Sequence, residues 1–194
     1  MPPSQTIKSE AIRLFALQGY DGTALSEIAK AVGIKTPSLY AHIDSKETLF
    51  MELFDDIARE HTEHLRVAIE AAGHSSLEER LFAVIRESCG DYTLSEVKST
   101  FLKRSLFFPP AYMRKEIQGR FLEAEQSLRG LLSSLFEEGV ADGTLRSIDV
   151  EQLIASFLCL MDGTFIQTHY YGAEEFGKRL PDIWKLYWAG IAAQ

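Results

Sequence analysis

Residues 36–50, TPSLYAHIDSKETLF, contain two helix starts in close succession. Thr36 offers a hydroxyl that can cap a helix, and Pro37 suits the first helical position, where its missing N–H is no loss. Ser45 offers a second cap of the same kind. The stretch therefore predicts a short helix over 37–43 and another helix that begins directly after Ser45.

The residues before this stretch predict a further short helix and a tight turn. Apolar side chains recur there at helical spacing: Leu25, Ile28, Ala29 and Val32. Gly33 follows, and a glycine just past a helix end adopts the left-handed conformation without steric cost. Two helices joined by a short glycine turn form a helix-turn-helix, whose second helix can enter the major groove of DNA. On spacing alone, an ordinary helical hairpin fits equally well.

The outward side of the predicted 37–43 helix favours the DNA-binding interpretation. Leu39 and Ile43 are four residues apart and are expected to face the core. The remaining side chains then face outward: Ser38, Tyr40, Ala41 and His42. A phenol and an imidazole can donate hydrogen bonds to phosphate oxygens, and a methyl group can contact thymine.

In combination, these features resemble a known DNA-binding domain. The matching positions are Ala11, Phe15, Gly19, Tyr20, Thr23, Ile28, Ala29, Val32, Gly33, the run 39–43 and the run 45–49. Residues 7–54 thereby resemble the DNA-binding domain of the TetR/AcrR family of bacterial transcriptional regulators. The resemblance implies phosphate contacts from Thr23, Tyr40, His42 and Lys46. It implies base or near-base contacts from Lys35, Thr36, Pro37, Ser38 and Ala41.

One position departs from the family pattern in a way that affects stability. Family members usually carry Thr or Ser where this chain has Ala24, and that hydroxyl caps the second helix. Loss of such a cap typically costs about 1 kcal/mol, unless Thr23 supplies the hydroxyl instead.

The rest of the chain also has helical spacing, with no alternating pattern typical of a strand. We predict an all-α fold of about nine helices: a helix-turn-helix domain of three helices over 1–46 and a ligand-binding and dimerisation domain over 47–194. Beyond the amino-terminal three, the expected helices begin near 46, 77, 95, 112, 149 and 174.

Composition limits the classes of protein that fit. The 194 residues are 46% hydrophobic and 25% charged, which indicates a globular chain. The formal net charge is −8, but residues 1–50 are neutral, so the acidity lies in the remainder. Cys89 and Cys159 both lie in apolar patterns and are expected to be buried, which fits a reducing cytoplasm. No apolar run is long enough to span a membrane, and we expect a cytoplasmic protein without a membrane partner.

The last two expected helices are candidates for a dimer interface. The segment 153–166 is apolar almost all round, so it needs more than one packing partner. An aromatic stripe on the final helix is by itself more often core than interface. The family resemblance implies a dimer through these helices, with Phe157, Ile183, Trp184, Tyr187, Trp188 and Ile191 as interface residues. Such a two-fold dimer would read a palindromic operator in double-stranded DNA.

A pocket for a small hydrophobic or aromatic effector is expected among the middle helices. The candidate residues are Ile85, Cys89, Tyr92, Phe101, Phe108, Phe121, Met161, Asp162 and Phe165. Asp162 is the charged member, and it fits either a cationic ligand group or a hydrogen bond across the dimer.

We find no motif for catalysis, a cofactor or a metal. His61 and His64 are three residues apart, with His169 distant, and such a pair is usually a solvated helix face. The expected function is a homodimeric repressor that an effector releases from DNA by shifting the helix that begins at Lys46. One alternative is a DNA-binding protein of the same fold that recruits a protein partner. A second alternative is a helical enzyme or ligand carrier.

Overall fold

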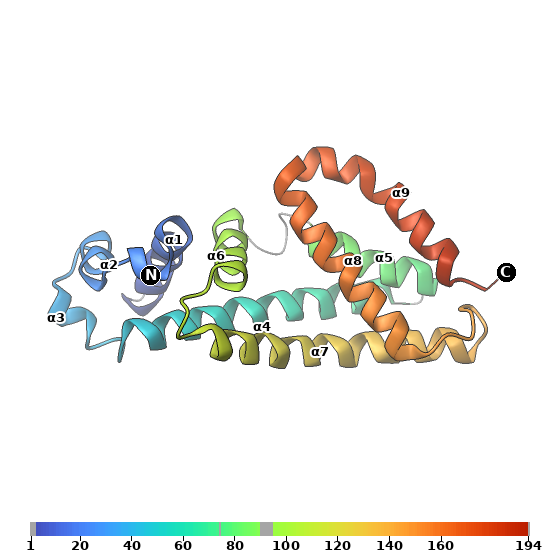
Figure 1. Cartoon of the computed structure of the whole chain (residues 1–194), viewed down its shortest axis with the longest axis horizontal. Helices are drawn as coiled ribbons and strands as arrows, with labels where there is room; N and C mark the ends of the chain where they lie inside the picture. The colour runs from blue at the N-terminus through green and yellow to red at the C-terminus, as the bar shows by residue number, and fades with distance from the viewer. Residues whose placement is uncertain (1–2, 74, 90–94, 194) are drawn as a thin grey trace. The chain divides into compact units, whose positions relative to one another are not determined.

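The computed structural model describes residues 3–73, 75–89 and 95–193, and these residues form nine α-helices (Figure 1). The helices are α1 (Pro3–Gly22), α2 (Leu25–Val32), α3 (Thr36–Leu39), α4 (Lys46–Ala72), α5 (Leu77–Cys89), α6 (Glu96–Phe107), α7 (Arg114–Ala141), α8 (Val150–Tyr171) and α9 (Ala173–Ile191). The predicted all-α fold is confirmed. None of these helices combines the length and the apolar character that a membrane span requires.

The chain folds into two compact units. The first unit comprises Met1–Glu60 and Leu94–Ala124, and the second comprises His61–Thr93 and Glu125–Gln194. Helices α4 and α7 each contribute residues to both units. These packing units do not coincide with the two functional domains predicted from the sequence, 1–46 and 47–194. The functional boundary between residues 46 and 47 stays a prediction.

The core of the first unit is built around three buried phenylalanine rings. Phe15 on α1 and Phe101 on α6 each lie against Phe50 on α4, with ring centroids 5.1 Å apart in both pairs. All three side chains are at most 3% exposed. Figure 1 shows α6 beside α1, far apart in sequence but adjacent within this unit. Helix α6 therefore shares its core with the predicted helix-turn-helix.

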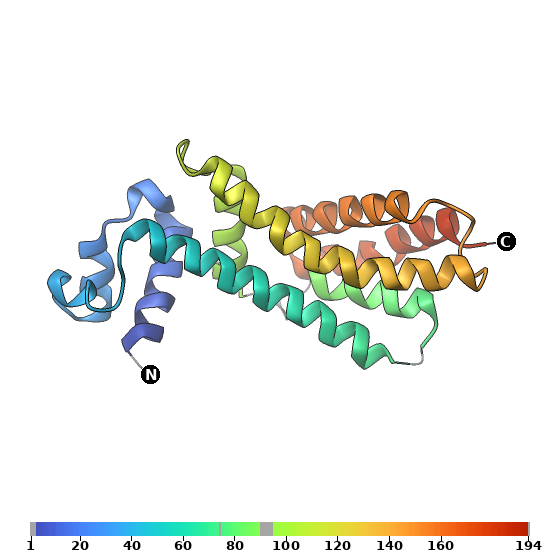
Figure 2. The same ribbon diagram turned by 90° about the horizontal axis from the view of Figure 1, so that it is seen from below.

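The second unit packs α8 against α5 and α9, and the same three helices can be followed in Figure 2. Phe157 of α8 is fully buried against Phe136 of α7, with ring centroids 5.7 Å apart. Trp184 of α9 is buried, and its Nε1 donates a hydrogen bond of 3.2 Å to Glu78. Burial of large apolar side chains is the main favourable contribution to such a core.

Several helices begin at a side-chain cap. Ser76 and Glu79 form a reciprocal capping box before α5, with distances of 2.9 and 3.2 Å. Ser95 caps α6 by accepting from the Lys98 N–H, and Asp149 caps α8. Each of these caps joins residues that are three positions apart in the sequence.

Candidate functional site

The turn between α2 and α3 has the geometry of a helix-turn-helix. Gly33 is left-handed, with φ 81° and ψ 24°. Its N–H donates to the carbonyl of Lys30 at 3.1 Å, and the N–H of Ile34 donates to Ala29 at 2.9 Å. This pair of bonds is a Schellman motif, which closes α2 and turns the chain sharply. The predicted glycine turn is thus present where the sequence placed it.

Helix α2 begins without a side-chain cap from its own N-cap residue. Ala24 occupies that position and has no acceptor, but its N–H donates to Glu27 Oε2 at 2.8 Å. Thr23 does not replace the missing cap, because its hydroxyl donates backwards to the Gly19 carbonyl at 2.8 Å. Thr23 is also only 1% exposed. This geometry corrects the expected phosphate contact, since the hydroxyl is buried and its proton is already used.

Helix α3 is shorter than predicted. It spans Thr36–Leu39, with Lys35 rather than Thr36 at the N-cap and no side-chain hydrogen bond there. Leu39 is fully buried and holds the helix against the core. The chain then turns, with the His42 N–H donating to the Leu39 carbonyl at 2.9 Å. Regular helix ends early because the chain must reach the start of α4 within the few residues that follow.

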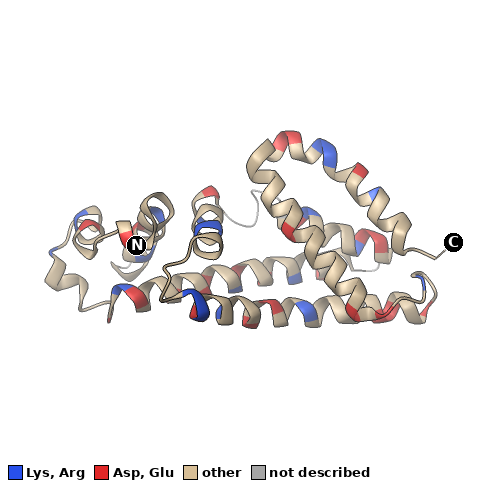
Figure 3. Cartoon of the chain, viewed as in Figure 1, with Lys and Arg blue, Asp and Glu red and all other residues tan. Residues whose placement is uncertain are grey.

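The predicted DNA-contacting residues lie together on the surface of this segment. The exposed members are Lys35, Pro37, Ser38, Tyr40, Ala41 and His42, and Thr36 is half-buried. Tyr40 is 55% exposed. Figure 3 shows that residues 36–43 include no Lys, Arg, Asp or Glu. The surface therefore offers hydroxyl, imidazole and methyl groups, which suit hydrogen bonds to phosphate and apolar contact with bases.

Lys46 has an orientation that the sequence did not predict. Ser45 caps α4 as expected, since its Oγ accepts the Thr48 N–H at 3.0 Å. Lys46 Nζ, however, donates to the carbonyls of Tyr20 at 2.8 Å and Thr23 at 2.9 Å. The ammonium also lies 4.1 Å from the centroid of the Tyr20 ring. Lys46 therefore points into the turn between α1 and α2.

The candidate effector residues do not form one pocket. Phe101, Phe108 and Phe121 belong to the first unit, whereas Ile85, Met161, Asp162 and Phe165 belong to the second. Phe101 and Ile85 are core residues, and Phe108 is 80% exposed. The Cys89 side chain and Tyr92 lie outside the described residues. Helical periodicity marks these positions as apolar, but it does not distinguish core from pocket lining.

Asp162 lies on the exposed side of α8 rather than in an apolar pocket. Partial removal from water, followed by the like charge of Glu125, raises the pKa of its carboxyl above the ordinary value.

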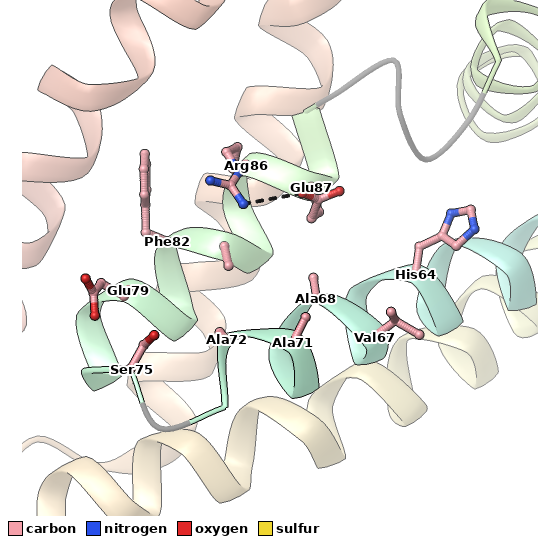
Figure 4. A pocket seen from close by; sticks show the side chains of 11 residues that line it. His64, Val67, Ala68, Ala71, Ala72, Ser75, Glu79, Phe82, Arg86 and Glu87 are labelled. Atoms are coloured by element: carbon pink, nitrogen blue, oxygen red, sulfur yellow. Dashed lines mark ion pairs between the residues drawn. The ribbon is translucent and has the colours of Figure 1, made fainter.

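The second unit instead contains a cleft of about 600 Å³ between α4 and α5 (Figure 4). Its lining residues are His64, Val67, Ala68, Ala71, Ala72, Ser75, Glu79, Phe82, Ala83, Arg86 and Glu87. The alanines give one wall a small, apolar surface, and Arg86 and Glu87 form an ion pair of 3.6 Å. A cleft of this volume fits a small organic molecule. The sequence does not reveal this cleft, because alanines at helical spacing are typical of an ordinary packed helix face.

His61 precedes this cleft on α4. The Nδ1 atoms of His61 and His64 are buried and have no hydrogen-bond partner among the described residues. Burial, followed by the charge of His64, lowers the pKa of His61 to about 4. The described residues contain no cluster of three potential metal-ligating side chains, and His169 is exposed on α8.

Acidification is expected to destabilise the chain through His61. The imidazole titrates near pH 6.5 when unfolded and near 4 when folded, so the unfolded state takes up the proton first. The stabilisation by neutral His61 is complete above pH 6.5 and is lost as the pH falls towards 4, by up to about 1.4 kcal/mol per pH unit. Urea unfolding of wild type and His61→Leu at about pH 7.5 and about pH 5 measures this. An equal loss of stability in both proteins would contradict the assignment.

The candidate interface residues are divided between core and surface. Phe157, Trp184 and Ile191 are buried in the core of their own unit, which corrects their assignment to a dimer interface. Ile183, Tyr187 and Trp188 are half-buried. The middle of the stripe, at Trp184 and Ile191, faces the core of its own unit, so only its flanking residues stay half-buried.

A shallow apolar groove of about 420 Å³ lies on α8 and α9, and the half-buried Ile183 and Tyr187 help to line it. Its lining residues are Ser156, Cys159, Leu160, Gly163, Thr164, Gln167, Ile183 and Tyr187. Cys159 is exposed there, so the expectation that it is buried was wrong. The remaining candidate interface is therefore this groove and its rim.

Residues 7–53 match the family described as "Bacterial regulatory proteins, tetR family". Over 44 residues the chain is 54% identical to the biofilm operon icaADBC HTH-type negative transcriptional regulator IcaR of Staphylococcus aureus (strain Newman). The aligned stretch covers 23% of this chain and 24% of IcaR, so the likeness extends over about a quarter of that protein.

Solved structures resemble the whole chain in fold. The fatty acid degradation regulator FadR from Bacillus halodurans superposes with a TM-score of 0.80 at 18% identity, covering 100% of this chain and 98% of FadR. FadR from Bacillus subtilis in complex with stearoyl-CoA gives 0.74 at 21% identity, covering 96% and 98%. The family match over residues 7–53 includes the helix-turn-helix formed by α2 and α3. Residues 7–53 are therefore similar to the tetR family of bacterial regulatory proteins, and the chain as a whole shares the fold of the two FadR structures.

Proposed function

We propose that the chain is a homodimeric, sequence-specific repressor that places α3 in the major groove of a palindromic operator. The observation that carries the proposal is the exposed surface of residues 35–42, in which Lys35 is the one charged side chain, held in place by the buried Leu39 and the Gly33 turn. The name of IcaR describes a negative transcriptional regulator, which supports repression as the direction of control.

Within that surface, we assign two kinds of contact. Tyr40 and His42 are exposed beyond the end of α3, where their hydroxyl and imidazole groups can donate to phosphate oxygens. The second set lies at or beside α3 and faces the base edges: Lys35, Thr36, Pro37, Ser38 and Ala41.

Dimerisation would use the groove on α8 and α9. Leu186 on α9 is 77% exposed, although it is a large apolar residue. Removal of such side chains from water favours association of two copies. Two copies then present two α3 segments to the two halves of a palindrome.

The effector in this proposal is a small hydrophobic or aromatic molecule bound in the cleft between α4 and α5. The Bacillus subtilis FadR, whose fold the chain shares, was solved with stearoyl-CoA, which supports effector binding within this fold. Helix α4 contributes residues to both units, so a change in it can reach the helix start at Ser45. The effector lowers DNA affinity only if it binds the two states of the chain unequally.

DNA binding is tested with operator-length DNA taken from upstream of the gene for this chain. The wild-type chain should form a specific, salt-sensitive complex with two chains per operator. Tyr40→Phe combined with His42→Ala should weaken binding roughly tenfold on operator and unrelated DNA alike, since both lost contacts are to phosphate. Tyr170→Phe is the matched control, because Tyr170 is 77% exposed on α8 of the second unit.

Other outcomes separate the alternatives. If wild type forms no specific complex, the repressor proposal fails, and compound binding alone would favour an enzyme or ligand carrier. If the complex forms but a panel of hydrophobic and aromatic compounds never changes its affinity, recruitment of a protein partner is favoured.

A further inference from the structure

The carboxyl end of α1 receives two cationic side chains from distant parts of the first unit. Lys46 of α4 donates to the carbonyls of Tyr20 and Thr23. Arg104 of α6 donates through one nitrogen to the carbonyls of Ala16 at 3.1 Å and Leu17 at 2.8 Å. Carbonyl oxygens at a helix end lack intrahelical donors and carry partial negative charge, so cations there are favourable.

The backbone at this point explains why the carbonyls are available. Gly19 interrupts the helical conformation of α1, with φ 77° and ψ 175°. The Gly19 carbonyl accepts the Thr23 hydroxyl. Three side chains from three elements thus satisfy the acceptors that the interruption leaves.

We infer that Lys46 is a positioning residue, which fixes the start of α4 against the end of α1, and is not a phosphate ligand. Two of its three ammonium protons have carbonyl partners, at 2.8 and 2.9 Å. The Tyr20 ring covers the ammonium at 4.1 Å, within the range of a cation–π contact. These partners hold the ammonium of the half-buried Lys46 against the turn between α1 and α2.

Tyr20 is itself held from a second side. Burial, followed by the hydrogen bond with Tyr112, raises the pKa of the Tyr20 phenol above its ordinary value, so the ring stays uncharged. The Tyr20 and Tyr112 ring centroids lie 6.2 Å apart. Lys46, Arg104 and Tyr112 therefore surround the end of α1, and they join the helix-turn-helix to the start of α4 and to α6 within the first unit.

The expected effect of Lys46 on DNA affinity rests on the proposed DNA-binding function. The salt dependence of that affinity distinguishes a positioning residue from a phosphate ligand. Loss of a lysine that contacts phosphate reduces the slope of log affinity against log salt concentration by about 0.9. Lys46→Met should lower affinity roughly tenfold at every salt concentration with an unchanged slope, because the recognition segment is held less firmly. Lys46→Arg should restore part of the affinity, since a guanidinium can reach the same carbonyls.

The matched control is Lys35→Met. Lys35 is exposed beside α3, and its side chain makes no cap hydrogen bond there. As an exposed cation beside the groove in the proposed complex, Lys35 should also neutralise phosphate charge, so Lys35→Met should reduce the salt slope. The two lysines differ in orientation but carry the same charge, so the comparison isolates orientation.

Amide hydrogen exchange of residues 20–24 provides a readout that needs no DNA. Exchange should be roughly tenfold faster in Lys46→Met and in Arg104→Met, and unchanged in Lys35→Met. If Lys46→Met reduces the salt slope and leaves exchange normal, Lys46 is a phosphate ligand and the inference is overturned. If Lys46→Met changes neither the DNA affinity nor the exchange rate, the inference is also overturned. If the wild-type chain binds no DNA specifically, the proposed function fails. Amide hydrogen exchange still tests whether Lys46 and Arg104 stabilise the end of α1. If Lys46→Met does not fold, Lys46→Gln replaces it in both measurements.

Discussion

Replacing Phe101 by alanine is expected to lower the free energy of unfolding by about 3–5 kcal/mol, measured by urea titration. Phe101 is 1% exposed and its ring lies against Phe50 and Phe15, so truncation leaves a cavity between α6, α4 and α1. DNA binding should fail at temperatures where wild type still binds, because the helix-turn-helix shares this core.

Phe108→Ala is the matched control for that experiment. Phe108 follows α6 directly and is 80% exposed, so its truncation should change stability by no more than about 0.5 kcal/mol. Sequence patterns placed both phenylalanines in an effector pocket. Similar effects of the two substitutions would refute the core position of Phe101.

Gly19→Ala is expected to cost about 2–3 kcal/mol of stability. Gly19 combines φ 77° with ψ 175°, a conformation that is essentially restricted to glycine. A Cβ atom at Gly19 would also lie 3.0 Å from Arg104 Nε, which is too close without movement of the guanidinium that caps α1. Thermal and urea unfolding measure the loss.

Gly119→Ala serves as the comparison, because it makes the same chemical change inside α7. A Cβ atom there would meet no atom within 4 Å, and the backbone is helical. Alanine should therefore raise stability by about 0.5–1 kcal/mol through its better helix propensity. Opposite signs at the two glycines are the expected result, and equal signs would show that the backbone at Gly19 is not strained.

The parts of the molecule that the sequence predicted correctly depend on interactions between near neighbours. The Gly33 turn and the Ser45 cap of α4 each involve residues within five positions of one another. Turn and cap chemistry is readable because its partners are adjacent in sequence.

The parts that were predicted incorrectly depend on partners far along the chain. Trp184 and Phe157 were assigned to an interface, but their partners on α5 and α7 fill the core of the same unit. The phosphate contact expected of Lys46 stays a prediction, but the sequence did not indicate the two carbonyls of the turn after α1 that lie within 3 Å of its Nζ. A helical pattern identifies the apolar side of a helix, not the element that covers it.

Helices α4 and α7 contribute residues to the cores of both units, with consequences for how the chain melts. When one unit melts, the parts of α4 and α7 that belong to it lose their packing partners, and most helical stability in proteins comes from such packing. Neither core can therefore melt as a free-standing domain would. A substitution that destabilises the second unit should therefore lower the folded fraction of the first unit in the cell, even where every residue of the first unit is intact.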